Sequence, residues 1–449
     1  MLLSRGTGHS WPGRRAGRCA ACVGVAALVA VGVRPAGAQA GAPRQEVGIS
    51  ATEIRVGVIA DVGNPVSPGL EQGPVDALEG FARYVNASGG IAGRQLVVDV
   101  YDSKANADET RNSIIAACTR DFALVGTAAN FVNNVDDLVG CPDSAGRPTG
   151  LPDIPVVTTD VVHKCSPVSF PVIAPELDCS TKSEPLQTYR TRQGSTLWLL
   201  QHVSRHLHGI FPLPADLQST KNTVLASDRA TESLGIKSDG ELDISAVAPQ
   251  SAYTPLIQTM KTKHSNYARV GIAYTTVVEL LREAKLQGLQ GVKAWDCPLS
   301  CYTPQFLIQG GAAVEGTYVT IFFLPFSEQR YNAELARFLR YTGTTHADAF
   351  AAEAWASAVL FRQAVDELVK RNGATGLTRA ALLAQIKATN GFDANGMIGR
   401  TDVGAKQVSP CYVLMQVRHG QFVRIHPSQP GTFDCTPSNV RSVKLNLSG

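Results

Sequence analysis

The apolar positions of this chain fall into short strand-like runs that are separated by segments of helical periodicity. Glu53–Ala60 (EIRVGVIA) is the first such run, and a helical segment at Val75–Asn86 follows it. Strands that alternate with helices predict a parallel sheet with right-handed crossovers. The further elements predicted for this part are a strand at Gln95–Tyr101, a helix at Asp108–Asp121, a strand at Ala123–Gly126, a helix at Asn133–Val139 and a strand at Asp153–Thr158.

A second alternating series follows residues 163–192, which lack clear periodicity and contain four prolines and two cysteines. We expect this proline-rich stretch to be a long extended connection between two units. The elements predicted beyond it are a helix at Ser195–His206, a strand at Thr223–Ala226, a helix near Thr231–Ile236, a strand at Asp243–Ala248, a helix at Tyr253–Lys263, a strand at Ala268–Ala273, a helix at Thr276–Gln287 and a strand at Val292–Trp295.

The last part of the chain is expected to return to the first unit. Val314–Leu324 (VEGTYVTIFFL) is rich in β-branched and aromatic residues and would carry the chain back. Pro410–Val417 and Gln421–Ile425, joined by His419-Gly420, are typical of an antiparallel hairpin. The helices predicted between these segments are Asn332–Tyr341, His346–Lys370 and Thr378–Ala388.

The first 38 residues have the pattern of a secretory signal peptide. Basic residues from Arg14 to Arg18 precede the apolar run Ala20–Val33, and Ala36-Gly37-Ala38 offers a small-residue cleavage site before Gln39. The apolar run of about 14 residues is shorter than a membrane span needs. A retained N-terminal anchor is the alternative, and we expect an exported protein that is periplasmic, cell-surface or extracellular after cleavage.

The net charge of the chain changes once the predicted leader is removed. The leader holds five arginines and no acidic residue, so 36 basic residues remain against 38 acidic ones, a net charge of −2. A near-neutral chain gives no electrostatic argument for nucleic-acid binding. A mature length of roughly 410 residues favours two lobes over one core.

Eight cysteines lie beyond the leader, and an even number in an exported chain predicts disulfides. The simplest connectivity pairs neighbours, since each pair brackets one loop or hairpin. Cys19 and Cys22 do not follow the apolar run, where a lipoprotein cysteine lies, so lipid anchoring is not expected. Zinc binding is the alternative to a disulfide for Cys297 and Cys301. No second cysteine pair has a spacing that would complete a zinc site, so we expect no metal. The neighbour pairs are Cys118–Cys141, Cys165–Cys179, Cys297–Cys301 and Cys411–Cys435.

Catalytic motifs are absent from the sequence. It contains no G-x-S-x-G, H-E-x-x-H, G-x-x-x-x-G-K-[ST] or, after the first strand, G-x-G-x-x-G pattern. His202 and His206 would share a helix face, yet no carboxylate motif accompanies them, and a polar surface face explains them. We expect a protein that is not an enzyme and needs no cofactor.

Residues 80–103 contain the most specific motif. Asn86 is followed by the glycine turn Gly89-Gly90-Ile91-Ala92-Gly93-Arg94, then by a strand that ends at Asp102-Ser103. This stretch resembles the type I periplasmic binding proteins, in the branched-chain amino-acid (Leu/Ile/Val) class of ABC-importer receptors. The resemblance extends from Glu53 to about Pro427, apart from the longer Cys/Pro-rich segments 141–151 and 163–192.

The resemblance implies an α/β fold of two Rossmann-like lobes, joined by three crossings, with a ligand cleft between them. We therefore expect the following parts: signal peptide 1–38, linker 39–52, first part of lobe 1 at 53–165, extended connection 166–194, lobe 2 at 195–316, second part of lobe 1 at 317–390, and at 391–449 a C-terminal hairpin on lobe 2 and a tail.

The resemblance also implies a ligand site at the carboxyl ends of the first-lobe strands, where helix N-termini suit a carboxylate. One loop contributes Ala129 and Asn130, and Asn130 stands where the family usually has serine. Asn130 could equally cap the following helix. Phe131 could stack on a flat or apolar ligand. The second loop contributes Thr159, Asp160 and Val161.

The second lobe is expected to supply the residues that close over the ligand. Tyr274 and Thr275 follow one predicted strand, and Tyr302 follows another. Interlobe packing is the alternative role for the two tyrosines. Glu232 or Asp228, placed after the predicted strand Thr223–Ala226, could bind a ligand ammonium group, although Asp228 could also cap a helix.

The function implied is capture of a small molecule, an amino acid or a related amide or carboxylate, and its delivery to the membrane permease of an ABC importer. A ligand-sensing receptor module of the same fold is the alternative. A secreted hydrolase would need a nucleophile–base pair that the sequence does not offer. We expect a monomer, and the sequence leaves the identity of the ligand open.

Overall fold

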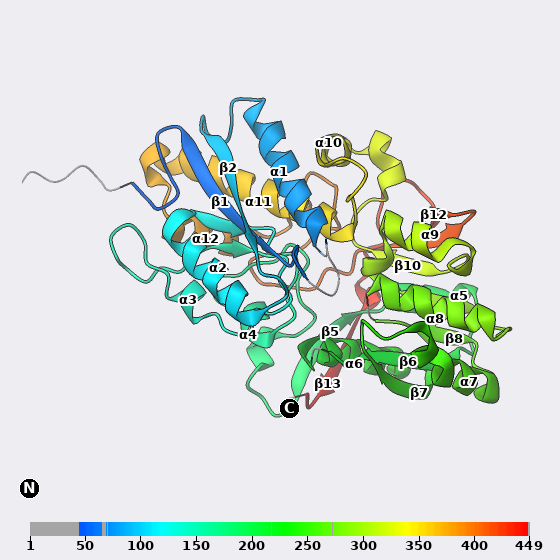
Figure 1. Cartoon of the computed structure of the whole chain (residues 1–449). Helices are drawn as coiled ribbons and strands as arrows, with labels where there is room; N and C mark the ends of the chain where they lie inside the picture. Colours follow the sequence, from blue (N-terminus) through cyan, green and yellow to red (C-terminus); the bar gives the residue numbers. More distant parts are fainter. Residues whose placement is uncertain (1–44, 65–68, 70, 217, 272, 448–449) are drawn as a thin grey trace, which may run out of the picture. The chain divides into compact units, whose positions relative to one another are not determined.

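The computed structural model describes residues 45–64, 69, 71–216, 218–271 and 273–447 (Figure 1). The predicted signal peptide, its cleavage site, Cys19 and Cys22 therefore lie outside the described residues. Within the described part, no helix combines the length and apolar character that a membrane crossing requires.

The first sheet is parallel and has the strand order β2-β1-β3-β4. The predicted strands are confirmed, with β1 at the expected bounds: the apolar runs of β1 and β3 are buried, whereas β2 is a partly exposed edge strand. Its strands are β1 (Glu53–Ala60), β2 (Gln95–Asp102), β3 (Ala123–Val125) and β4 (Asp153–Ile154), and the helices between them are α1 (Gln72–Asn86), α2 (Ala107–Arg120) and α3 (Asp136–Val139).

The glycine turn between α1 and β2 has a clear physical cause. Asn86 ends α1, and its side chain both donates to the Leu96 carbonyl (2.9 Å) and accepts from the Leu96 amide (2.8 Å). The chain must therefore reverse its direction within the few residues between α1 and β2. Gly90 has φ +83°, and a Cβ there would meet the Arg94 carbonyl oxygen at 1.9 Å, so only glycine fits.

The second sheet has seven strands in the order β12-β11-β10-β9-β8-β6-β7. Strands β6 to β10 run parallel, and β11 and β12 form the predicted antiparallel hairpin at its edge. The strands are β6 (His208–Pro214), β7 (Lys237–Ile244), β8 (Tyr267–Arg269), β9 (Ala294–Cys297), β10 (Tyr318–Ile321), β11 (Val413–Arg418) and β12 (Gln421–His426). The helices of this part are α5 (Gly194–His202), α6 (Gln218–Ser233), α7 (Thr254–Lys263), α8 (Tyr274–Leu286) and α9 (Pro304–Gly310).

The prediction for the start of this series is wrong. Thr223–Ala226 lies inside α6, and the strand that was missed is β6. Proline is disfavoured within a sheet because it has no N–H group to donate. Pro212 and Pro214 lie beyond Ile210, where pairing with the short β8 ends, so they cost no hydrogen bond on that side of β6.

The return of the chain also differs from expectation. Strand β10 pairs with β9 and β11, so residues 318–321 belong to the second sheet and not to the first lobe. The chain then reaches α10 (Ala333–Thr342), α11 (Ala349–Asn372) and α12 (Arg379–Lys387), as predicted. Helix α11 packs on α1, with the Phe81 and Trp355 ring centroids 5.0 Å apart (yellow and blue in Figure 1).

A third, two-stranded sheet was not predicted. Strand β5 (Gln187–Arg192) pairs antiparallel with β13 (Val440–Leu445), so the connection after lobe 1 runs beside the last strand of the chain. The chain passes between the two large sheets three times: through β5, after β10, and through residues 388–412.

All four predicted cysteine pairs are disulfides in the structure. The Cys118–Cys141 bridge lies against Arg379, a fully buried residue that begins α12. Its guanidinium donates to the carbonyl oxygens of Cys118 (2.8 Å), Asp121 (2.5 Å) and Pro142 (2.7 Å). Arg379 therefore ties α12 to the end of α2 and to the loop after α3.

Replacing Arg379 should show how much its hydrogen bonds contribute to the stability of the fold. We expect Arg379→Leu to lower the free energy of unfolding by about 3–5 kcal/mol, because buried carbonyl groups lose their donors. Urea unfolding measures the loss. Lys387→Ala, an exposed site on the same helix, should change stability by less than about 0.5 kcal/mol. A loss below about 1 kcal/mol for Arg379→Leu would show that the carbonyls find other partners.

Candidate functional site

Asp61, the residue directly after β1, organises the carboxyl edge of the first sheet. The side chain is fully buried. Its Oδ1 accepts from Ser103 Oγ (2.6 Å) and the Ala105 amide (3.0 Å), and its Oδ2 accepts from the Asn130 amide (2.9 Å) and Nδ2 (2.8 Å). The loops that follow β1, β2 and β3 are thereby held together.

The two first-lobe loops predicted to bind ligand do meet. Thr159 Oγ1 donates to the Asn130 carbonyl (2.6 Å), which joins the loop after β4 to the loop after β3. Ala129 is fully buried, whereas Asn130, Phe131 and Thr159 are half-buried.

The suggestion that Asn130 caps a helix is wrong. The next helix, α3, begins only at Asp136, and the side chain that accepts from its first amide is Asn134 Oδ1 (2.7 Å). The side-chain Nδ2 of Asn130 instead donates to Asp61. The side-chain oxygen of Asn130 therefore remains available to accept a hydrogen bond.

Asp160 and Val161 lie at the start of a short helix, α4 (Val161–Lys164). Asp160 Oδ2 is buried and has no hydrogen-bond partner among the described residues. At the other end of α4, Lys164 Nζ donates to Thr223 Oγ1 in α6 (2.7 Å), a direct bond to the second lobe. Burial lowers the pKa of Lys164 to about 8, although Glu176 and Asp160 oppose the shift.

In the second lobe, Tyr274 and Thr275 open helix α8 and are half-buried. The Tyr274 hydroxyl accepts from Gln309 Nε2 (3.3 Å). Burial raises the pKa of Tyr274, and the negative charge of Asp348, the residue before α11, adds to the shift. The Tyr274 ring also packs against the main hydrophobic core.

Tyr302 does not have the predicted position. Only 4% of it is exposed, and its hydroxyl accepts from the Phe326 amide (2.8 Å). Its ring packs against Phe323 and Phe422, with centroids 5.5 and 4.6 Å away. Tyr302 is therefore a core residue in this structure, in agreement with the packing alternative.

Glu232 is also misplaced, because Asp228–Glu232 lie inside α6 and not in a loop after a strand. Glu232 pairs with Arg229 (2.8 Å), one turn earlier on the same helix. The residues that follow β6 are Ala215 and Asp216, and they occupy the place that the prediction gave to Asp228.

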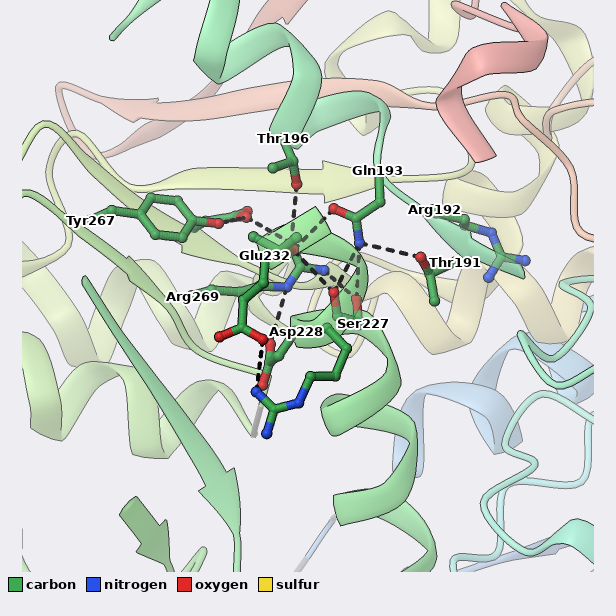
Figure 2. A network of polar contacts seen from close by, with 12 residues as sticks. Thr191, Arg192, Gln193, Thr196, Ser227, Asp228, Glu232, Tyr267 and Arg269 are labelled. Atoms are coloured by element: carbon green, nitrogen blue, oxygen red, sulfur yellow. Dashed lines mark hydrogen bonds and ion pairs between the residues drawn. The ribbon is translucent and has the colours of Figure 1, made fainter. Parts of the chain in front are cut away.

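Asp228 instead belongs to a polar network around Arg269 (Figure 2). The Arg269 guanidinium donates to Asp296 Oδ2 (3.0 Å), Ser227 Oγ (2.6 Å) and Thr196 Oγ1 (3.3 Å). Burial raises the pKa of Asp228, and the nearby Arg269 opposes the shift. The network joins α5, α6, β8 and β9.

Gln193, directly after β5, attaches the crossing segment to this network. Its Nε2 donates to the Ser227 carbonyl (3.1 Å), and its Oε1 accepts from Thr231 Oγ1 (3.0 Å), both in α6 (Figure 2). No pattern in the sequence indicated this role. The arrangement holds the first crossing in a fixed position on the second lobe.

Three carboxylates near the first-sheet edge were not predicted: Glu71 before α1, Asp348 before α11, and Glu353 in α11. Asp348 caps α11 by accepting from the Ala351 amide (2.8 Å), and burial raises its pKa to about 6. Burial also raises the pKa of Glu353 to about 8, with Arg192 opposing the shift. Among the described residues, no group of three or more histidine, cysteine or acidic side chains could hold a metal ion.

The raised pKa of Glu353 predicts a pH dependence of stability. Between its ordinary pKa of 4.5 and about 8, the folded protein retains a proton that the unfolded chain releases, so stability falls as pH rises through this window. Glu353→Gln should remove a decrease on the order of 3 kcal/mol between pH 5 and pH 8. In the Glu353→Gln variant, the raised pKa of Asp348 should leave a smaller decrease of the unfolding free energy with pH.

Urea unfolding of the ligand-free protein at the two pH values measures this difference. Glu367→Gln, an exposed site on the same helix, is the matched control and should keep the wild-type slope. If Glu353→Gln also kept that slope, Glu353 would be ionised in the fold without penalty.

Comparison with known proteins supports the resemblance seen in the sequence. A family model described as "Periplasmic binding protein" matches residues 53–421, most of the chain. No curated protein matches significantly in sequence.

Solved structures share the fold at low sequence identity. The leucine-binding protein LivK from Thermotoga maritima matches with a TM-score of 0.63 and 13% identity, over 83% of this chain and 97% of that one. The branched-chain amino-acid transporter substrate-binding protein LivJ from Streptococcus pneumoniae, in complex with isoleucine, has a TM-score of 0.62 and 17% identity, over 83% and 100%.

A fatty-acid ABC transporter substrate-binding protein from Thermomonospora curvata is as similar, with a TM-score of 0.64 and 15% identity, over 87% of this chain and 98% of that one. These identities establish the two-lobed fold and no particular ligand. With the family model over most of its length, the chain belongs to the periplasmic binding protein family, of type I.

Proposed function

We propose that this protein captures a small solute outside the cytoplasmic membrane and delivers it to the permease of an ABC importer. The observation that carries the proposal is the meeting of the loops after β3 and β4, at the carboxyl edge of the first sheet. Ligands of open α/β sheets bind at this edge. Half-buried Asn130, Phe131 and Thr159 offer polar and aromatic contacts there.

The proposed site continues with Asp160 and Val161 in the first lobe and with Tyr274 and Thr275 in the second. The lobes would comprise residues 53–165 with 333–390, and residues 195–321 with the hairpin of β11 and β12. Export would rest on the leader 1–38. Solved relatives include proteins named for leucine, for isoleucine as bound ligand and for fatty acid, so an amino acid or another carboxylate is the first class to test.

No chemical step is assigned to this site. Among the described residues at the sheet edge, Ser103 donates to the Asp61 carboxylate, but both side chains are fully buried and that carboxylate also accepts from Ala105 and Asn130, so we interpret the contact as structural. Binding and release of the solute, with movement of the lobes about the crossings, are the activity we propose.

A ligand screen by thermal shift, followed by calorimetry, tests this function. A true ligand should raise the melting temperature in proportion to the logarithm of its concentration. Asn130→Ala should weaken binding by about 10-fold or more, because a partly desolvated hydrogen bond is lost. It should also reduce stability by about 1 kcal/mol through the lost bond to Asp61.

Asn133→Ala, an exposed position in the same loop, is the control and should leave affinity unchanged. If a ligand bound equally well to the Asn130→Ala protein, the site would lie elsewhere. If no small molecule stabilised the wild-type protein, solute capture itself would be contradicted.

A further inference from the structure

The Cys118–Cys141 disulfide differs from the other three bridges in its contact with a buried cation. Arg379 is fully buried, and its Nη1 donates to Cys141 Sγ at a distance of 2.9 Å. Among the described residues, no lysine, arginine or histidine side chain donates a hydrogen bond to a sulfur atom of the other bridges. The environment of this one bridge is therefore positively charged.

The Arg379 guanidinium has no ion pair or hydrogen bond with a carboxylate among the described residues. Its other hydrogen bonds go to three backbone carbonyl oxygens, and its Nε has no partner in the part of the chain that the structure describes. Burial lowers the pKa of Arg379, because the cation loses its hydration. A buried charge without a bound counter-ion is costly, so a negative charge next to this guanidinium would be stabilised.

The acidic groups near Arg379 are bound to other donors. Glu46, Asp121 and Asp143 act on the guanidinium only through their charge. Asp143 pairs with Arg147 (2.7 Å), Asp121 accepts from a tyrosine hydroxyl (2.7 Å), and Glu46 accepts from backbone amides. The bridge sulfur is thus the side-chain atom that the guanidinium contacts directly.

Reduction of this bridge would create the missing anion. It would place a Cys141 thiolate at the position that Arg379 already contacts, and a neighbouring guanidinium favours the thiolate over the thiol. Stabilising the reduced form raises the reduction potential of a disulfide, and a thiol of lower pKa is also the better leaving group. The contact should therefore make this bridge easier to reduce than the other three.

The two sulfur atoms differ in access, and this difference sets the direction of the reaction. Cys141 is 1% exposed, whereas Cys118, in the last turn of α2, is half-buried. An incoming thiolate would therefore reach Cys118 Sγ and displace Cys141, the sulfur that Arg379 stabilises.

We propose that Cys118–Cys141 is a redox-active bridge that exchanges with an external dithiol. One thiolate of the dithiol bonds to Cys118 Sγ, the Cys118–Cys141 bond breaks, and Cys141 leaves as a thiolate paired with Arg379. The second thiol of the dithiol loses its proton to solvent and attacks the mixed disulfide, which releases Cys118 to take up a proton. The bridge gains two electrons, and the dithiol is oxidised to a disulfide. This reaction does not depend on the solute site proposed above.

A redox titration of the native protein tests the proposal. The protein is equilibrated with dithiothreitol at increasing ratios of reduced to oxidised reagent, free thiols are alkylated, and mass spectrometry reports the state of each bridge. We expect Cys118–Cys141 to open at a ratio about 10-fold lower than any other bridge requires, which corresponds to a potential about 30 mV higher.

The Cys411–Cys435 bridge is the matched internal control. Its cysteines are 24 residues apart and those of Cys118–Cys141 are 23 apart, so the two bridges close loops of nearly equal length. Cys435 is exposed, so access alone would make the control bridge the first to open. If Cys411–Cys435 or Cys165–Cys179 opened before Cys118–Cys141 or together with it, the proposal would be overturned.

The acidity of the Cys141 thiol tests the role of Arg379 separately. In Cys118→Ser, we expect this thiol to titrate about one pH unit below an ordinary cysteine, an acidity about 10-fold stronger, measured as the thiolate absorbance in excess of the wild type. Adding Arg379→Gln, which keeps a donor but removes the charge, should return the thiol pKa to the ordinary range or above. Cys411→Ser frees the exposed Cys435, which should titrate like an ordinary cysteine.

Melting curves of each variant show whether it folds. If the Arg379→Gln double variant did not fold, the titration of Cys118→Ser would still decide the result, and the redox titration of the wild type needs no variant. A Cys141 thiol that titrated at or above the ordinary range in folded Cys118→Ser would overturn the proposal. Solute capture would be unaffected by that result.

Discussion

The candidate site depends on one buried carboxylate. Asp61 directly follows the first strand and accepts four hydrogen bonds, from Ser103, Ala105 and twice from Asn130. The donors come from the loops that follow β2 and β3, so the carboxylate ties both loops to the end of β1. Because the carboxylate is fully buried, losing these donors would leave a charge without compensation, and the loops are therefore held firmly.

The same principle of a buried polar anchor recurs where the lobes are joined. Gln193 and Arg269 fasten the end of β5 to α5, α6 and β8, so the first crossing is held on the second lobe. Lys164 makes a direct bond from α4 to α6, and its Nζ is buried enough to lower its pKa. The attachment through Gln193 leaves lobe movement to the crossing segments, whereas the bond between Lys164 and Thr223 links the two lobes directly.

Local patterns in the sequence predicted the first lobe well. The strands β1 and β2 and the glycine turn before β2 depend on short-range information, an apolar run and a side chain that bonds across ten residues. The disulfides were predicted because each joins neighbours along the chain. The β5–β13 pair was missed because its strands are far apart in sequence and largely polar, and no local pattern records such pairing.

In the site too, some residues could be placed from local sequence patterns and others could not. Asn130 and Thr159 follow apolar strands, so their meeting could be predicted, whereas Tyr302 could not be distinguished from a rim aromatic until its burial was known. Glu71 and Glu353 sit at or in helices, where charged residues are usually solvated. Only the fold reveals that both are buried and that one oxygen of each carboxylate lacks a hydrogen-bond partner among the described residues.

The central claim is that solute binds at the edge organised by Asp61. A crystal structure of the protein with a solute found by the screen tests it most directly. The account predicts ligand atoms within hydrogen-bonding distance of the loops 126–131 and 158–161. The structure offers a different location, an open polar cavity of about 300 Å³ lined by residues that include Asn390, Asp402 and Gln407. Density for the solute in that cavity, with the loops after β3 and β4 empty, would contradict the account.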